Sequence, residues 1–161
     1  MLALRLVHLI ESRSDLVAAK LLNLFLTEDK CSDLHKVPQE EIRDRTREIC
    51  KNLSDWLTNK TEKEVEKRYM ELGARRQAQG VRLSQVIWAL DATREHIHDF
   101  LRAEGFMENT VELVGTMDLM GQLDRFFDLA IYYVAVGYEH AHEKQHEHGH
   151  KKGTLDIVAS F

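Results

Sequence analysis

The last part of the chain is rich in histidine, a side chain well suited to holding a metal ion. Five histidines stand among glutamates and lysines there: His140, His142, His146, His148 and His150. Neutral imidazole binds zinc, nickel or copper, and His-rich tracts bind such metals. If the segment is helical, His142 and His146 share a face because they are four residues apart. The competing interpretations are a linker, or a solvated helix end that Gly149 terminates. We favour these, since a compositional signal is weak.

A second set of polar and aromatic residues interrupts or flanks the apolar faces of the later helices. Its members are Tyr69, Arg76, Trp88, Thr93, Arg94 and Phe127. Apolar walls with a few fixed donors predict a small pocket between helices, suited to an anionic or amphipathic ligand. The simpler interpretation gives the arginines structural roles. Arg76 would cover a helix end, and Arg94 would pair with a nearby carboxylate such as Glu71 or Glu95.

Haem is a third possibility, and it requires a histidine that projects into an apolar slot. His96 and His98 are the internal histidines that the sequence places best for this. Neither falls squarely on the apolar stripe of their predicted helix, which is formed by Leu90, Ile97 and Leu101. A haem-based sensor is therefore the weaker alternative, and the identity of any cofactor stays unknown.

The sequence carries no recognisable catalytic motif. It has no phosphate-binding glycine loop, no H-E-x-x-H, no G-x-S-x-G and no paired C-x-x-C. Cys31 and Cys50 suit a reducing compartment better than a disulfide framework. The net charge of −5 provides no basic field to attract nucleic acid. The apolar start, Met1–Ile10, is too short and polar to span a bilayer. We expect a non-enzymatic cytoplasmic protein that neither binds nucleic acid nor inserts into a membrane.

Apolar residues at helical spacing predict an all-α domain of about five helices, either globin-like or a helical bundle. The helices are expected at about 2–26, 38–59, 61–80, 83–104 and 109–138, with a loop at 28–37. The polar residues Ser12–Asp15 interrupt the first helix and could cap a separate second half. Thr61 and Glu64 match a capping box, and Gly80 suits a left-handed helix end. We expect a helical sensor-like domain at 1–138, followed by a His-rich helix extension and flexible tail at 139–161.

The fifth predicted helix has the longest apolar stripe, from Leu113 to Tyr138. A stripe of that length exceeds what one small core needs, so part of it is expected to face a second copy of the chain. Gly115 and Gly121 would let two such helices approach closely. The sequence therefore predicts a homodimer formed through this helix.

One stretch of the chain resembles a known family. Residues 69–87 read YMELGARRQAQGVRLSQVI, with the pattern LG-x-x-R-x-x-x-G-x-x-L-S, and Arg94 follows in the next apolar helix. This pattern is similar to the N-terminal helical sensor domain of the RsbR- and RsbRD-type stressosome co-antagonists. The similarity extends from about Leu2 to Tyr138. It implies an all-helical dimer that receives a signal and controls a partner protein.

In those co-antagonists an output domain of the STAS type follows the sensor and carries phosphorylatable residues. Here only Glu139–Phe161 remain, so we expect that domain to be missing and carry over none of its chemistry. The favoured function is a non-catalytic sensory module that binds a small ligand or partner protein and signals through altered helix packing. The alternatives are a metal-binding protein that uses its His-rich tail and, less favoured, a haem-based sensor.

Overall fold

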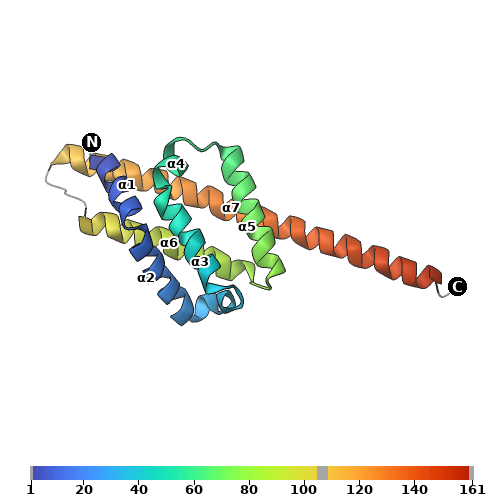
Figure 1. Ribbon diagram of the computed structural model, residues 1–161. Helices are drawn as coiled ribbons and strands as arrows, with labels where there is room; N and C mark the ends of the chain where they lie inside the picture. Colours follow the sequence, from blue (N-terminus) through green and yellow to red (C-terminus); the bar gives the residue numbers. More distant parts are fainter. Residues whose placement is uncertain (1, 105–108, 160–161) are drawn as a thin grey trace.

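The computed structural model describes the backbone of residues 2–104 and 109–159 and the side chains of residues 4–104 and 109–149. Helices account for almost all of this part of the chain, and no strand occurs in it (Figure 1). The elements are α1 Leu2–Ser12, α2 Ser14–Thr27, the 3-10 helix η1 Asp29–Lys36, α3 Gln39–Lys51, α4 Leu53–Thr58, α5 Glu62–Ala78, α6 Leu83–Glu104 and α7 Thr110–Ala159. The all-α prediction is confirmed, with eight helices in the described residues in place of about five.

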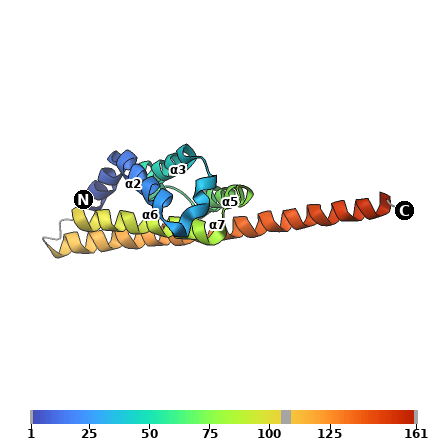
Figure 2. The ribbon, with the colours of Figure 1, turned by 90° about the horizontal axis from the view of Figure 1, so that it is seen from below.

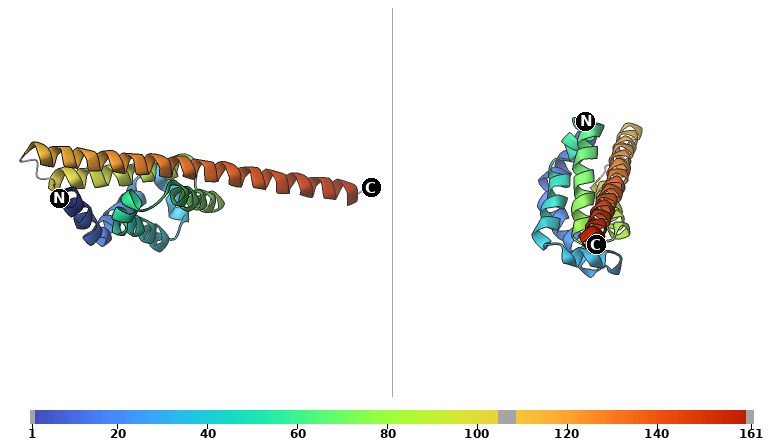
Figure 3. Two further views of the ribbon diagram at one scale, coloured as in Figure 1. Left: turned by 90° about the horizontal axis from the view of Figure 1, so that it is seen from above. Right: turned by 90° about the vertical axis from the view of Figure 1, so that its right-hand side faces the viewer.

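The helices form two layers. α6 and α7 lie side by side in one layer, and α1, α2, α3 and α5 cover one face of it (Figures 2 and 3). α5 crosses α7 and packs more extensively against it than any other pair of elements. The second part of α7 projects beyond the other helices, so the described C-terminal end lies far from the body (Figure 1).

Two of the predicted helices are each divided into two by a short break in the backbone, and the apolar residues continue on the same face across each break. Arg13 (φ −106°, ψ 18°) separates α1 from α2, and Asn52 (φ −110°, ψ 25°) separates α3 from α4. Apolar residues stay in phase across each break, so periodicity favoured single helices at 2–26 and 38–59. The break at Arg13 falls within Ser12–Asp15, where the sequence allows a separate second half, whereas the break at Asn52 was not anticipated. The segment expected to be a loop at 28–37 mostly forms η1, whose Cys31 and Leu34 are buried in the core.

Several helix ends follow signals that the sequence carries. Thr61 and Glu64 form the predicted capping box, and Gly80 adopts a positive φ of 78°. Asn109 accepts a hydrogen bond from the backbone N–H of Glu112 at 3.0 Å, which caps α7. The capping box was predictable because it needs only two residues three positions apart, and the end at Gly80 because glycine readily adopts a positive φ.

α7 is longer than expected and continues past Tyr138 without a break. Gly149 lies within this helix and does not end it, contrary to the sequence interpretation. We call residues 139–159 the α7 extension. Among the described residues, no helix has the length and apolarity needed to cross a membrane.

Candidate functional site

Two residues of the predicted ligand set, Arg76 and Thr93, line the same buried cavity. It lies between α2, η1, α3, α5 and α6 and has a volume of about 60 Å³. That volume holds a few water molecules and is well below that of a typical small-molecule pocket. The Thr93 hydroxyl donates to the Ala89 carbonyl at 2.8 Å, so it is already engaged within its own helix.

Arg76 is 4% exposed and forms a buried ion pair with Glu41 of α3. Its Nη1 lies 2.6 Å from Glu41 Oε1 and 2.8 Å from Gln79 Oε1. Arg75 also donates to both oxygens of Glu41. Hydrogen bonds from Arg75 and then from Arg76 lower the pKa of Glu41 to about 2, against the opposing effect of burial. This cluster holds the C-terminal end of α5 against the start of α3. The half-buried Glu41 carboxylate needs a cation as its counter-charge, and Arg76 provides one, which is a structural role.

Arg94 lies elsewhere, at the contact between α6 and α7. Its guanidinium pairs with Asp91 of its own helix, with Asp128 at 2.8 Å and with Asp124 at 3.9 Å. The predicted pairing with a nearby carboxylate is confirmed by Asp91, whereas Glu71 and Glu95, the two examples named, are not the partners. Asp124 and Asp128 stand about thirty positions away in α7, and helical spacing cannot reveal such partners.

His98 belongs to the same contact, with Nε2 at 3.1 Å from Asp124 Oδ1. His96 lines a surface hollow between α2 and α6, together with Leu16 and Phe100. Burial lowers its pKa. Neither histidine lines the cavity beside Arg76. The two histidines considered as haem ligands therefore lie in two different places, His98 at the contact between α6 and α7 and His96 in the surface hollow.

The aromatic members of the predicted set belong to the core. Tyr69 is 3% exposed and stacks edge-on against Trp56 and Phe126, with ring centroids 5.9 and 5.8 Å away. Burial raises the pKa of its hydroxyl. Phe127 is fully buried beside Phe126, and Trp88 is half buried against the same core. The structure therefore distributes the six predicted residues over three separate places.

A larger pocket opens beside this aromatic cluster, and sequence reasoning did not anticipate it. It has a volume of about 310 Å³ and lies between α4, α5 and α7. Trp56, Phe126 and Leu129 give it an apolar wall, while Lys60 and Arg125 contribute cations and Glu62 contributes one carboxylate. Lys60 Nζ lies 5.7 Å from the centroid of the Trp56 ring. Its size reaches the lower end of the range for small-ligand sites. No local pattern could have revealed it, because three separate elements form it.

Two glycines, Gly73 of the family motif and Gly137, set the contact between α5 and α7. A Cβ atom at Gly73 would lie 2.3 Å from the carbonyl oxygen of Val134, and one at Gly137 would lie 2.3 Å from that of Met70. The two backbones are therefore in direct contact. A Cβ atom at Gly115 or Gly121 would meet nothing within 4 Å in the same chain, so their expected role between two copies of the chain stays a prediction.

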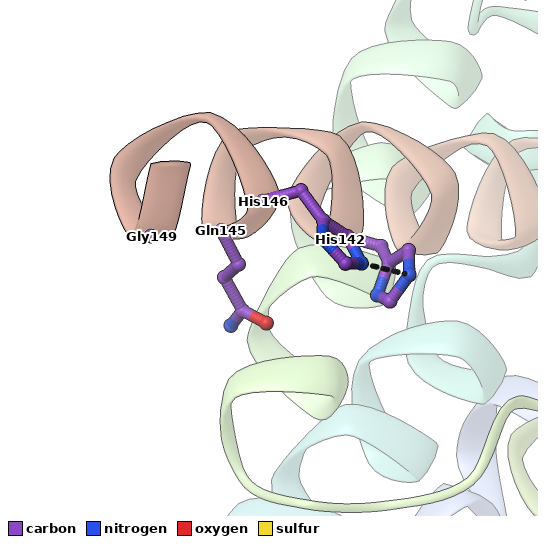
Figure 4. Close-up of a pocket in the computed structure, with 4 residues that line it drawn as sticks. All are labelled: His142, Gln145, His146 and Gly149. Carbon is purple, nitrogen blue, oxygen red and sulfur yellow. Dashed lines mark hydrogen bonds between the residues drawn. The ribbon is translucent and has the colours of Figure 1, made fainter. Parts of the chain in front are cut away.

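The His-rich part of the chain lies on the α7 extension, where its described side chains are exposed. His142 and His146 point toward one another, with their Nε2 atoms 3.1 Å apart (Figure 4). His148 Nδ1 contacts the Lys144 carbonyl at 2.9 Å, and the side chain of His150 lies outside the described residues. No group of three or more His, Cys, Asp or Glu side chains suited to one metal ion occurs in the part that the structure describes.

Comparison with known proteins gives one positive result. Residues 15–152 match the family model for the N-terminal domain of the RsbT co-antagonist protein RsbRD. No curated protein and no solved structure matches the chain. The matched range covers α2 to α7 and most of the His-rich segment, and it includes both glycines of the α5–α7 contact. The chain therefore belongs to the family of RsbRD N-terminal domains, as the motif around Gly73 and Gly80 suggested.

Proposed function

We propose that this chain is a non-catalytic cytoplasmic sensory module in which a signal received by the helical body changes the position of α7. Membership of a family of regulatory co-antagonist domains supports a regulatory role. The observation that carries the proposal is the backbone contact at Gly73 and Gly137, together with the continuation of α7 beyond it. The body would comprise residues 1–138, and residues 139–161 would form the segment available to a partner protein.

The glycine contact supports this because no side chain separates the two helices. A side chain at a helix interface can absorb a small displacement by changing rotamer, whereas two backbones in contact cannot. A shift of α5 would therefore pass directly to α7 and move the extension with it. The signal would act as a change in population between two helix packings.

The ligand site that we propose is the pocket between α4, α5 and α7. Its apolar wall suits a small amphipathic ligand, and its two cations, Lys60 and Arg125, outnumber the single carboxylate of Glu62 and so favour an anion. A ligand there would touch both helices of the glycine contact. The six-residue site predicted from sequence stays a prediction, with Arg76 and Thr93 at a cavity that holds only a few waters.

Native mass spectrometry of the purified chain tests this location. We expect a co-purified small molecule to be lost from a Lys60→Met, Arg125→Met variant and retained by an Arg76→Met variant that remains folded. Retention by the double variant would contradict the location of the site.

We also propose that the chain forms a homodimer through α7. The interface would use another face of this helix than the apolar stripe described in the sequence analysis. Leu123, Phe127 and Val134 are fully buried within the chain itself, so they cannot form an interface without unfolding it. On the outward face of α7, Val114 is 59% exposed and Met117 is 62% exposed. Exposed apolar residues concentrated at the start of α7 favour a protein–protein contact there.

Sedimentation velocity tests the dimer. We expect the parent chain to sediment as a dimer at high micromolar concentration and a Val114→Glu, Met117→Glu variant to sediment as a monomer with unchanged helix content. Leu4→Glu with Leu16→Glu is the matched control, because these residues are about half exposed and lie on α1 and α2. A monomeric parent, or a control that dissociates equally, would contradict the proposed interface.

A further inference from the structure

The α7 extension carries two imidazoles whose relative position was not settled by the sequence. His142 and His146 lie one helical turn apart, with ring centroids separated by 4.5 Å and ring planes inclined by 81°. Their Nε2 atoms are 3.1 Å apart, and both rings lie on the same side of the helix (Figure 4). The two Nε2 atoms are within hydrogen-bond distance, with one ring donating and the other accepting, and an ion bound by both nitrogens would replace that hydrogen bond.

This separation matches that of two nitrogens bound to one metal ion. Zinc–nitrogen bonds of about 2.0–2.1 Å place two ligands about 2.9 Å apart at a right angle and about 3.4 Å apart at the tetrahedral angle. The 3.1 Å between the two Nε2 atoms falls between these limits. Two histidines at positions i and i+4 of a helix are also a known arrangement for holding a transition-metal ion.

We propose that His142 and His146 form a two-imidazole chelate for a divalent transition-metal ion of the zinc, nickel or copper class. Each ring would bind through Nε2 and carry its one proton on Nδ1, so the rings stay neutral. One straight helix offers an ion only two such donors, because residues eight apart are separated by about 12 Å along the axis. Water or a donor from another molecule completes the coordination.

The surroundings leave room for those remaining ligands. The pair borders an open hollow of about 420 Å³, which Gln145 and Gly149 also line (Figure 4). Gly149 contributes no side chain that could close the hollow, and Glu139 adds a negative charge one turn before His142. A cation therefore finds both space and a favourable local charge there.

The position of the pair gives metal binding a structural consequence. Gln145 exchanges two hydrogen bonds with Gln77 near the end of α5, at 3.0 and 3.1 Å. The pair thus occupies the turn at which the extension touches the body. A metal ion that bridges His142 and His146 would hold this turn in the helical state, since it cross-links positions i and i+4. The inference depends neither on dimerisation nor on the ligand pocket.

Isothermal titration of the untagged, chelator-treated full chain with NiCl₂ alone tests the chelate. The test variant is His142→Ala with His146→Ala. The matched control removes more histidines, as His140→Ala, His148→Ala and His150→Ala, but keeps the pair. We expect the control to bind Ni²⁺ as tightly as the parent and the test variant to bind on the order of 100-fold more weakly, because it loses the intramolecular second ligand.

Helix content provides a second measurement. Saturating Ni²⁺ should raise the temperature at which the parent and the control lose helical circular dichroism signal, and leave that of the test variant unchanged. The proposal is overturned if the parent binds no Ni²⁺, or if the test variant binds it as tightly as the control. Equal binding by all three proteins would show that Ni²⁺ binds the histidines of the segment without preference for the His142–His146 pair.

Discussion

The two parts of α7 have the same backbone conformation and opposite surroundings. Before Tyr138 the helix buries Leu123, Phe127 and Val134 completely and touches α5 through Gly137. After Tyr138 the described side chains are almost all exposed glutamate, histidine, lysine and glutamine. The first part is fixed by the fold, whereas the second is free to meet a partner or an ion. One uninterrupted helix can therefore connect the core of the domain to a displayed surface.

The largest expected effect concerns the fixed support of α7, where Glu41 holds α5 through Arg76. Glu41→Gln would leave the buried Arg76 guanidinium without its counter-charge and should cost about 3–5 kcal/mol of unfolding free energy. Chemical denaturation would measure this. Glu139→Gln, on the exposed extension, is the control and should change stability very little.

The same pair predicts an acid dependence. Because the folded state lowers the pKa of Glu41 to about 2, its stabilising contribution is present above the ordinary carboxyl pKa. That contribution is lost as the pH falls from about 4.5 toward about 2. Unfolding free energy measured across this window should decline less steeply in Glu41→Gln than in the parent. Equal slopes would show that the pair does not stabilise the fold.

Gly137→Ala should have the next largest effect. Its Cβ would lie 2.3 Å from the carbonyl oxygen of Met70, so the two backbones must separate at a cost of about 3 kcal/mol. Gly121→Ala is the matched control in the same helix, with open space around its Cβ. It should stabilise the chain by up to about 1 kcal/mol, the usual gain from alanine over glycine in a helix. Similar changes in unfolding free energy for both variants would show that Gly137 is no more tightly packed than Gly121.

Tyr138 marks the boundary between the two parts of α7. Its hydroxyl donates to the Val81 carbonyl at 2.7 Å in a buried position. Tyr138→Phe would leave that carbonyl without this donor and should cost about 1–2 kcal/mol. Tyr132→Phe, at an exposed position of the same helix, should be neutral in the same thermal denaturation experiment.

Truncation after Tyr138 should have the smallest effect. A chain that ends after Tyr138 loses the described hydrogen bonds between Gln145 and Gln77, and should lose no more than about 1 kcal/mol of stability. A chain that ends after Ile131 also loses the buried Val134, Gly137 and Tyr138, and should not fold. A large loss on the first truncation would show that the extension belongs to the core.

Sequence periodicity predicted the helical class and the helix ends that depend on near neighbours, such as Thr61 and Glu64. It could not predict the break at Asn52, because Ile49 and Leu53 on its two sides remain in phase. It also assigned Leu123 and Phe127 to a stripe without showing that the chain's own helices cover them. Burial depends on which elements meet, and a single sequence does not show this.

The ligand site predicted from sequence also shows that contacts between helices cannot be derived from a single sequence. Arg76 and Thr93 do meet at one cavity, but Arg94 finds its partners Asp124 and Asp128 in another helix. Conversely, the i,i+4 relation between His142 and His146 was predictable because both lie on one helix. Contacts within a helix follow from spacing, whereas contacts between helices require the fold.

The central claim is that the α5–α7 contact fixes the direction of the extension. Electron–electron distance measurement between spin labels at Lys20→Cys and Glu147→Cys tests it directly, since both positions are exposed and the native Cys31 and Cys50 are buried. Residue 147 lies about 15 Å along the helix from Gly137, so a tilt at the contact moves the label. We predict a single distance that shifts in Gly137→Ala and is unchanged in Gly121→Ala. A distance that is the same in all three proteins would contradict the claim.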